Sequence, residues 1–139
     1  MIILDTSGLL AAVDASQHSH HRAREALLAA DPPWLLSPFV LAELDYLLAS
    51  QVGQSAERAL LTEVGRGVYR LEDFGPDDIL AAEKLIGKYS DLNVGLADAS
   101  LVVLANRYGV AELLTLDERH FRALRRRGGG RFRLLPADM

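Results

Sequence analysis

The feature that most constrains the fold is the alternation of short apolar segments with longer helical patterns along the whole chain. Five segments are candidate strands: residues 1–4, 34–37, 68–71, 112–115 and 132–135. Short apolar runs are typical of strands buried on both faces of a parallel sheet, because crossover helices cover such a sheet on both sides. We therefore expect a parallel sheet at the centre of the molecule.

Helical patterns fill the stretches between these segments. They are expected at residues 8–13, 22–30, 39–50, 54–64, 78–89 and 96–105, and a last helix opens at 116–121. Strands that alternate with helices in this way form a sheet with right-handed crossovers. The sequence predicts the α/β class: a three-layer α/β/α sandwich with a central, mostly parallel sheet of four to five short strands, in a single domain of residues 1–139.

The amino-acid composition excludes some kinds of site and predicts where the protein is located. The chain has no cysteine, which excludes disulfides and thiolate metal sites. It starts directly with an expected core strand, and it has neither a charged-then-apolar leader nor an apolar run of ~20 residues. These features predict a cytoplasmic protein without a membrane segment.

Charge is distributed unevenly along the chain. Residues 1–118 carry 18 acidic and 8 basic side chains, whereas residues 119–139 carry seven arginines and a single acid, Asp138. The arginines are Arg119, Arg122, Arg125, Arg126, Arg127, Arg131 and Arg133. An acidic region beside a basic one suits a cation-dependent enzyme that acts on a polyanion. The alternative is a solvated, partly disordered turn around the three glycines at 128–130.

Asp5 ends the first apolar segment and is followed by two hydroxyl residues and a glycine. In an open α/β sheet, ligands bind at the carboxyl ends of the strands. A helix begins almost at once, so Asp5 or Thr6 could instead be its N-cap. The placement of the other carboxylates decides between these two roles.

Three further acids are expected at the same edge of the sheet. Glu43 lies one turn into the helix after the second strand, on the flank of its apolar stripe. Asp98 lies in the first turn of the most apolar helix, inside its expected core face, where an unpaired ionised carboxylate is costly. Asp117 repeats the pattern around Asp5, because it stands between an apolar strand and a helix and has a hydroxyl residue nearby. Taken alone, Asp117 would also fit the N-cap of that helix.

Four converging carboxylates repel one another unless divalent cations hold them together. Oxygen ligands without cysteine or a well-placed histidine suit Mg²⁺ or Mn²⁺, which can promote in-line displacement at a phosphodiester. The histidines at 18, 20 and 21 resemble a metal tract, but His20 and His21 are adjacent and point apart on a helix. We interpret these histidines as the start of a surface helix.

Four short motifs occur in order along the chain: Asp5-Thr6-Ser7, Ala42-Glu43-Leu44, Leu96-Ala97-Asp98-Ala99 and Leu114-Thr115-Leu116-Asp117. Each is weak alone, but the ordered set, with its strand and helix contexts, resembles the PIN-domain ribonucleases of the VapC toxin type. The resemblance covers essentially the whole chain. It implies a PIN-like fold and a Mg²⁺- or Mn²⁺-dependent endoribonuclease that acts as the toxin of a toxin–antitoxin pair.

The resemblance also implies roles for the acids. It makes Asp5 and Asp98 the main metal ligands. Glu43 would bind metal or orient the attacking water, and Asp117 would occupy a second or water-mediated metal position. Ser7 matches the hydroxyl that supports Asp5, and the neighbouring hydroxyls are those of Thr6 and Thr115.

The partners implied by the resemblance are an RNA substrate, a cognate antitoxin whose tail enters the active site, and a second copy of the chain in a homodimer. The sequence itself suggests which residues would hold the RNA backbone. The expected RNA-binding residues are Arg119, Arg122, Arg125, Arg126, Arg127 and Arg131.

Two other functions fit parts of the sequence. The first is a non-cleaving RNA-binding module that inhibits translation through its C-terminal arginines and uses the acids only for structure. The second is a phosphohydrolase with an aspartyl nucleophile at Asp5. That chemistry generally places a second acid two residues after the nucleophile, and this position holds Ser7. RNA cleavage is therefore the leading hypothesis.

Overall fold

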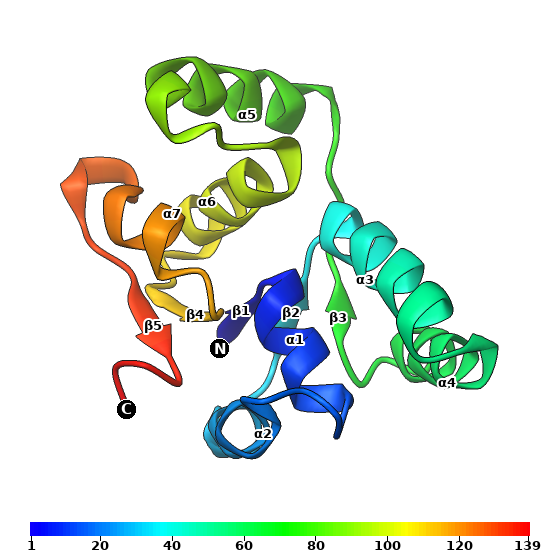
Figure 1. Ribbon diagram of the computed structural model, residues 1–139. Coiled ribbons are helices and arrows are strands. Elements are labelled where there is room, and N and C mark those ends of the chain that lie inside the picture. Colours follow the sequence, from blue (N-terminus) through cyan, green and yellow to red (C-terminus); the bar gives the residue numbers. More distant parts are fainter.

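Five short strands form one wholly parallel sheet in the computed structural model, which describes residues 1–139 (Figure 1). The strands are β1 (Ile2–Leu4), β2 (Trp34–Leu36), β3 (Arg70–Leu71), β4 (Glu112–Leu114) and β5 (Arg133–Leu135). Their spatial order is β3-β2-β1-β4-β5, and every neighbouring pair is parallel. The predicted α/β class and parallel sheet are confirmed.

β1 is the central strand and is completely buried. Ile3 pairs with Leu35 of β2 on one side and with Leu113 of β4 on the other. The chain builds outward from β1 first through β2 and β3, and later through β4 and β5. The order of the strands therefore reverses between β1 and β4, and in open parallel sheets the carboxyl ends at such a reversal form a binding crevice.

Seven α-helices surround the sheet. They are α1 (Thr6–Val13), α2 (His20–Ala29), α3 (Pro38–Gln51), α4 (Gln54–Gly65), α5 (Pro76–Lys88), α6 (Leu96–Tyr108) and α7 (Glu118–Ala123). Figure 1 shows α5, α6 and α7 above the sheet, α2 below it, and α3 with α4 beyond its β3 side. None of these helices combines the length and apolar composition that crossing a membrane requires.

α6 is the helix most deeply embedded in the core. Every residue from Ala99 to Ala105 is buried, so the helix is covered on nearly all sides rather than along one stripe. It ends at Tyr108, and Gly109 then takes a left-handed conformation with φ of 66°. A glycine at that position ends a helix without steric cost.

The segment rich in arginine and glycine is ordered into defined turns. After α7 a short 3₁₀ helix, η2 (Arg127–Gly129), precedes β5, and the Arg126 amide donates to the Gly130 carbonyl at 2.8 Å. Gly128 and Gly129 have φ values of 83° and 87°, which L side chains rarely adopt. The glycines therefore allow the tight return from α7 to the edge of the sheet.

Candidate active site

The four predicted acids occupy one edge of the sheet, at the carboxyl ends of β1 and β4. Asp5 directly follows β1, Asp117 precedes α7, and Asp98 and Glu43 lie near the starts of α6 and α3. The acids are close enough to influence one another's ionisation. The charges of Asp117 and Glu43 raise the pKa of Asp98, and the charge of Asp98 raises the pKa of Asp5. The structure therefore brings the four predicted carboxylates to the same edge of the sheet.

Asp5 is the most buried of the acids, with 5% of its surface exposed. Its Oδ2 accepts hydrogen bonds from Thr115 Oγ1 at 2.6 Å and from Ser7 Oγ at 2.9 Å. Burial raises the pKa of Asp5 to about 6, although these two hydrogen bonds favour the ionised form. Asp5 stands at the N-cap position of α1, yet its side chain caps no backbone amide. The carboxylate is thus held by two side-chain hydroxyls and does not act as a helix cap.

Ser7 and Thr115 join the two strand ends that carry acids. Thr115 Oγ1 accepts a hydrogen bond from the Asp117 amide at 2.9 Å while it donates to Asp5. Ser7 Oγ accepts from the Leu116 amide at 3.0 Å while it donates to Asp5. The loop after β4 is consequently fixed against the first turn of α1, and both hydroxyls donate to the carboxylate of Asp5.

Glu43 reaches the site from the exposed side of α3. Its Oε1 accepts a hydrogen bond from Thr6 Oγ1 at 2.7 Å. Thr6 therefore supports Glu43 through its side chain, and the neighbouring Ser7 supports Asp5. Consecutive hydroxyls at the start of α1 hold two different acids of the site.

Asp98 lies in the first turn of α6 with one fifth of its side chain exposed. Burial is the main reason that its pKa is raised, and the charges of Asp117 and Glu43 act in the same direction. The contact with His120 has the opposite effect, but the pKa remains above its usual value. The ionised form of Asp98 would therefore gain from a bound cation.

Asp117 is the N-cap of α7 and also lies beside the other acids. As the cap, its Oδ1 accepts a hydrogen bond from the His120 amide at 3.1 Å. Its other oxygen, Oδ2, lies 3.2 Å from His120 Nδ1 and faces the acidic cluster. One carboxylate can therefore end the loop after β4 and still contribute an oxygen to the site.

His120 lies among these acids, and the sequence analysis did not predict its position there. Its Nδ1 lies 2.9 Å from Asp98 Oδ2 as well as beside Asp117, and one fifth of its side chain is exposed. The available signal was its position three residues after Asp117, since residues at this spacing share one face of a helix. The expectation of a site without a well-placed histidine was wrong.

Comparison with known proteins identifies the family. Residues 2–127 match the PIN domain. The chain belongs to the PIN-domain family. It is 46% identical over 135 residues to Ribonuclease VapC26 from Mycobacterium tuberculosis, a match that covers 97% of this chain and 100% of the relative. The predicted resemblance to the VapC-type PIN domains is thereby confirmed.

Solved structures share the fold of this PIN domain at lower sequence identity. VapC20 from Mycobacterium tuberculosis, a toxin that cleaves the sarcin–ricin loop, superposes with a TM-score of 0.79 at 23% identity, over 84% of this chain and 90% of that one. VapBC2 from Rickettsia felis, bound to promoter DNA, gives a TM-score of 0.67 at 22% identity, over 96% of this chain and 98% of that one.

The side chains of this PIN domain fit a divalent cation. Asp98, Asp117 and His120 each offer one ligand atom, and these atoms lie within 4.8 Å of one another. Asp5 adds a buried carboxylate whose ionised form is disfavoured without a positive charge nearby. Carboxylate oxygens with at most one imidazole are a donor set for Mg²⁺ or for a first-row transition ion.

The C-terminal arginines of the PIN domain divide into engaged and free side chains. Arg122 pairs with Glu118 at 2.9 Å and with Asp138 at 2.6 Å, and Arg133 pairs with Glu112 at 3.0 Å. Arg125 and Arg126 donate to backbone carbonyls. The arginines whose side chains make no ion pair or hydrogen bond are Arg119, Arg127 and Arg131.

Proposed function

We propose that this PIN domain is an endoribonuclease that depends on Mg²⁺ or Mn²⁺ and acts as the toxin of a toxin–antitoxin pair. The observation that carries the proposal is the convergence of Asp5, Glu43, Asp98 and Asp117 at the strand reversal between β1 and β4. The 46% identity to a protein named as a ribonuclease supports it.

Each acid has a role that follows from its surroundings. Asp5 and Asp98 hold the cation, because both carboxylates are buried enough that their ionised forms need a positive charge. When bound, the cation would activate a water and stabilise charge on the phosphodiester. Asp117 supplies a further oxygen from the N-cap of α7.

Glu43 is the acid best placed to orient the attacking water. Its carboxylate comes from the exposed side of α3, and Thr6 fixes one oxygen at 2.7 Å. The second oxygen can then accept a proton or a hydrogen bond from a water in a defined direction. Ser7 and Thr115 hold the carboxylate of Asp5 in place during this step.

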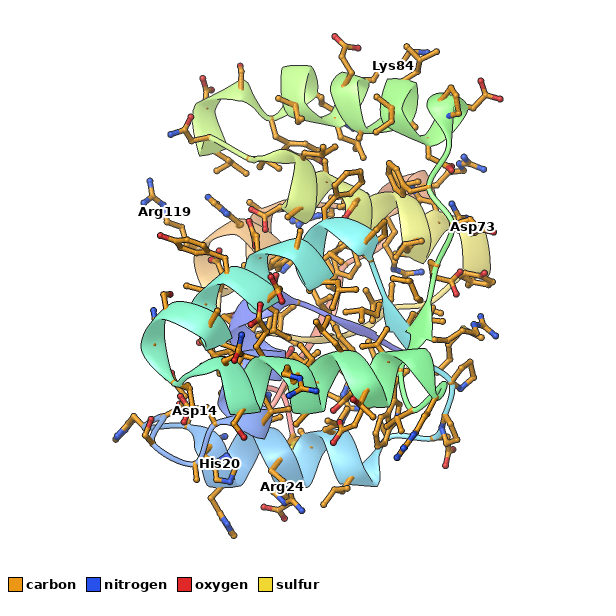
Figure 2. All side chains as sticks on the ribbon, turned by 90° about the vertical axis from the view of Figure 1, so that its right-hand side faces the viewer. Asp14, His20, Arg24, Asp73, Lys84 and Arg119 are labelled. Carbon is orange, nitrogen blue, oxygen red and sulfur yellow. The ribbon has the colours of Figure 1, made fainter.

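RNA would bind through the arginines that have no partner within the chain. Figure 2 shows Arg119 extending outward from the body of the protein, and it stands on α7, one residue before His120. Arg127 and Arg131 are also exposed. Contacts from such side chains to phosphates position the RNA with little sequence preference.

The proposed toxin would be silenced by a protein antitoxin. VapBC proteins from Rickettsia felis and Salmonella typhimurium, both bound to DNA, share the fold of this chain, the second with a TM-score of 0.69 over 96% of each chain at 18% identity. Homodimer formation and a cytoplasmic location remain predictions. Sedimentation velocity of the purified chain tests the first, and cell fractionation tests the second.

The proposed activity is tested by incubating the purified protein with RNA and Mg²⁺ or Mn²⁺, alone and with a chelator. We expect internal cleavage that requires the cation and is lost in Asp98→Asn. Equal cleavage by Asp98→Asn would contradict the site. RNA binding that weakens with salt, without cleavage under any metal condition, would instead favour a non-cleaving RNA-binding module.

A further inference from the structure

His120 is held between two carboxylates by elements that are distant in the sequence. Its Nδ1 lies 2.9 Å from Asp98 Oδ2, on α6, and 3.2 Å from Asp117 Oδ2, at the start of α7. One potential ligand atom from each of these three residues falls within a 4.8 Å cluster. The imidazole is therefore part of the same small cluster of donors as the acids.

Helix capping does not require this position of the ring. Asp117 already caps α7 by accepting from the backbone amide of His120, and the imidazole takes no part in that hydrogen bond. The ring instead brings Nδ1 to one oxygen of each neighbouring carboxylate, Oδ2 of Asp98 and Oδ2 of Asp117. The cluster thus combines two carboxylates with a single imidazole, an arrangement that a bound cation would stabilise.

The donor chemistry of the cluster differs from that of an all-oxygen site. Mg²⁺ strongly prefers oxygen ligands, whereas first-row transition ions bind imidazole nitrogen as well as carboxylate. We propose that His120 Nδ1 is a metal ligand beside Asp98 and Asp117, and that it makes this site select first-row transition ions, Mn²⁺ among them, over Mg²⁺. The inference rests on the proposed function, because it concerns the cation of that same site.

The preference for transition ions over Mg²⁺ would follow from the geometry of α7. Asp117 and His120 are three residues apart and so lie on one face of the helix, opposite Asp98 on α6. An ion that accepts both an oxygen and the nitrogen would join α7 to α6, whereas an ion confined to oxygen would use only the carboxylates. We therefore expect Mn²⁺ to protect the folded protein against thermal unfolding more than Mg²⁺ does at equal free ion concentration.

Pulsed electron paramagnetic resonance of the Mn²⁺-loaded protein tests the proposal without RNA. Wild type should show ¹⁴N modulation from a coordinated imidazole, and His120→Gln should not. His21→Gln is the matched control, because His21 is exposed at the start of α2 and should leave the signal unchanged. Absence of ¹⁴N modulation in wild type, or its persistence in His120→Gln, would overturn the proposal.

Competition between Mn²⁺ and Mg²⁺ gives a second readout. His120→Gln should weaken Mn²⁺ binding by about tenfold or more and Mg²⁺ binding by less than about threefold. His120→Asp, which replaces nitrogen by an oxygen ligand, should keep metal binding and shift the preference toward Mg²⁺. An equal loss for both ions would contradict selectivity by His120, and unchanged metal binding in Asp98→Asn would instead contradict the proposed active site.

Discussion

Gly8 in the first turn of α1 lies against the backbone of Leu114 at the end of β4. A Cβ at Gly8 would lie 2.5 Å from the Leu114 carbonyl carbon and 2.8 Å from the Thr115 nitrogen. Backbone atoms cannot move aside as a flexible side chain can. The missing side chain at Gly8 therefore permits the close approach that brings Thr115 to Asp5, where the two residues form a 2.6 Å hydrogen bond.

Gly8→Ala should destabilise the fold and impair the site together. Because the added methyl group meets backbone, α1 must shift away from β4, and we expect the free energy of unfolding to fall by about 1–3 kcal/mol. Urea denaturation measures this change. The matched control is Gly87→Ala in α5, where a Cβ meets nothing within 4 Å; it should stabilise the protein by about 0.5–1 kcal/mol. Equal stability of the two variants would contradict the packing role of Gly8.

The raised pKa of Asp5 predicts a pH dependence of the metal-free protein. Its pKa is about 6 in the folded state against 3.8 for the ordinary group, so the folded state binds the proton more tightly than the unfolded chain does. The contribution of Asp5 to stability is thus fully present below about pH 4 and is lost as the pH rises to about 6. The shift corresponds to about 3 kcal/mol.

Asp5→Asn isolates this contribution, because asparagine does not ionise in this range. With chelator present, the free energy of unfolding of the variant should increase relative to wild type between pH 4 and pH 7, by up to about 3 kcal/mol. Urea denaturation at each pH measures the difference. Adding Mn²⁺ at pH 7 should stabilise wild type more than Asp5→Asn. A difference that does not change with pH would show that Asp5 ionises normally in the folded protein.

The strands and the four acids were predictable from sequence for a local reason. Each acid stands at a strand end or in an early helical turn, and in a parallel sheet these positions share one edge. The sequence did not predict that β1 lies at the centre of the sheet, because the order of the strands depends on pairing between segments that are distant in the chain. The sequence alone therefore indicated which residues meet but not how they are packed.

Side-chain partners account for what the sequence analysis missed or left open. His120 reaches Asp98 only because α7 folds back onto the start of α6. Thr6 and Ser7 are adjacent and similar, yet they support different acids, Glu43 and Asp5. The hydrogen-bond partner of each of these residues depends on the direction of its side chain after folding, which neither residue type nor spacing specifies.

The Thr6–Glu43 hydrogen bond predicts a positioning role for Thr6. Thr6→Val keeps the branched shape but removes the donor, so Glu43 would lose its fixed orientation, and kcat/KM for RNA cleavage should fall by about tenfold. Combining Thr6→Val with Glu43→Gln should cost little beyond Glu43→Gln alone, since both changes affect the same contact. Thr62→Val, on the exposed side of α4, is the control for replacing a threonine hydroxyl by a methyl group, and it should leave kcat/KM unchanged. Additive losses would show that Thr6 acts independently of Glu43.

Arg119 and Arg122 occupy the same short helix but should contribute differently to RNA binding. Arg119 makes no ion pair, whereas Arg122 is engaged by Glu118 and by Asp138, whose pKa is lowered to about 2 by this contact. Neutralising a phosphate-binding cation on single-stranded RNA lowers the slope of log affinity against log salt concentration by about 0.7. We expect this decrease for Arg119→Gln and a smaller one for Arg122→Gln.

Fluorescence anisotropy with labelled RNA, at several salt concentrations and in the Asp98→Asn background, separates binding from cleavage in this comparison. Arg122→Gln should instead release Asp138, so that the pKa of this carboxyl returns toward its ordinary value in an NMR titration. If the two variants change the salt dependence of RNA affinity equally, the ion pairs of Arg122 do not prevent this side chain from binding RNA. The binding surface would then extend over both arginines of α7.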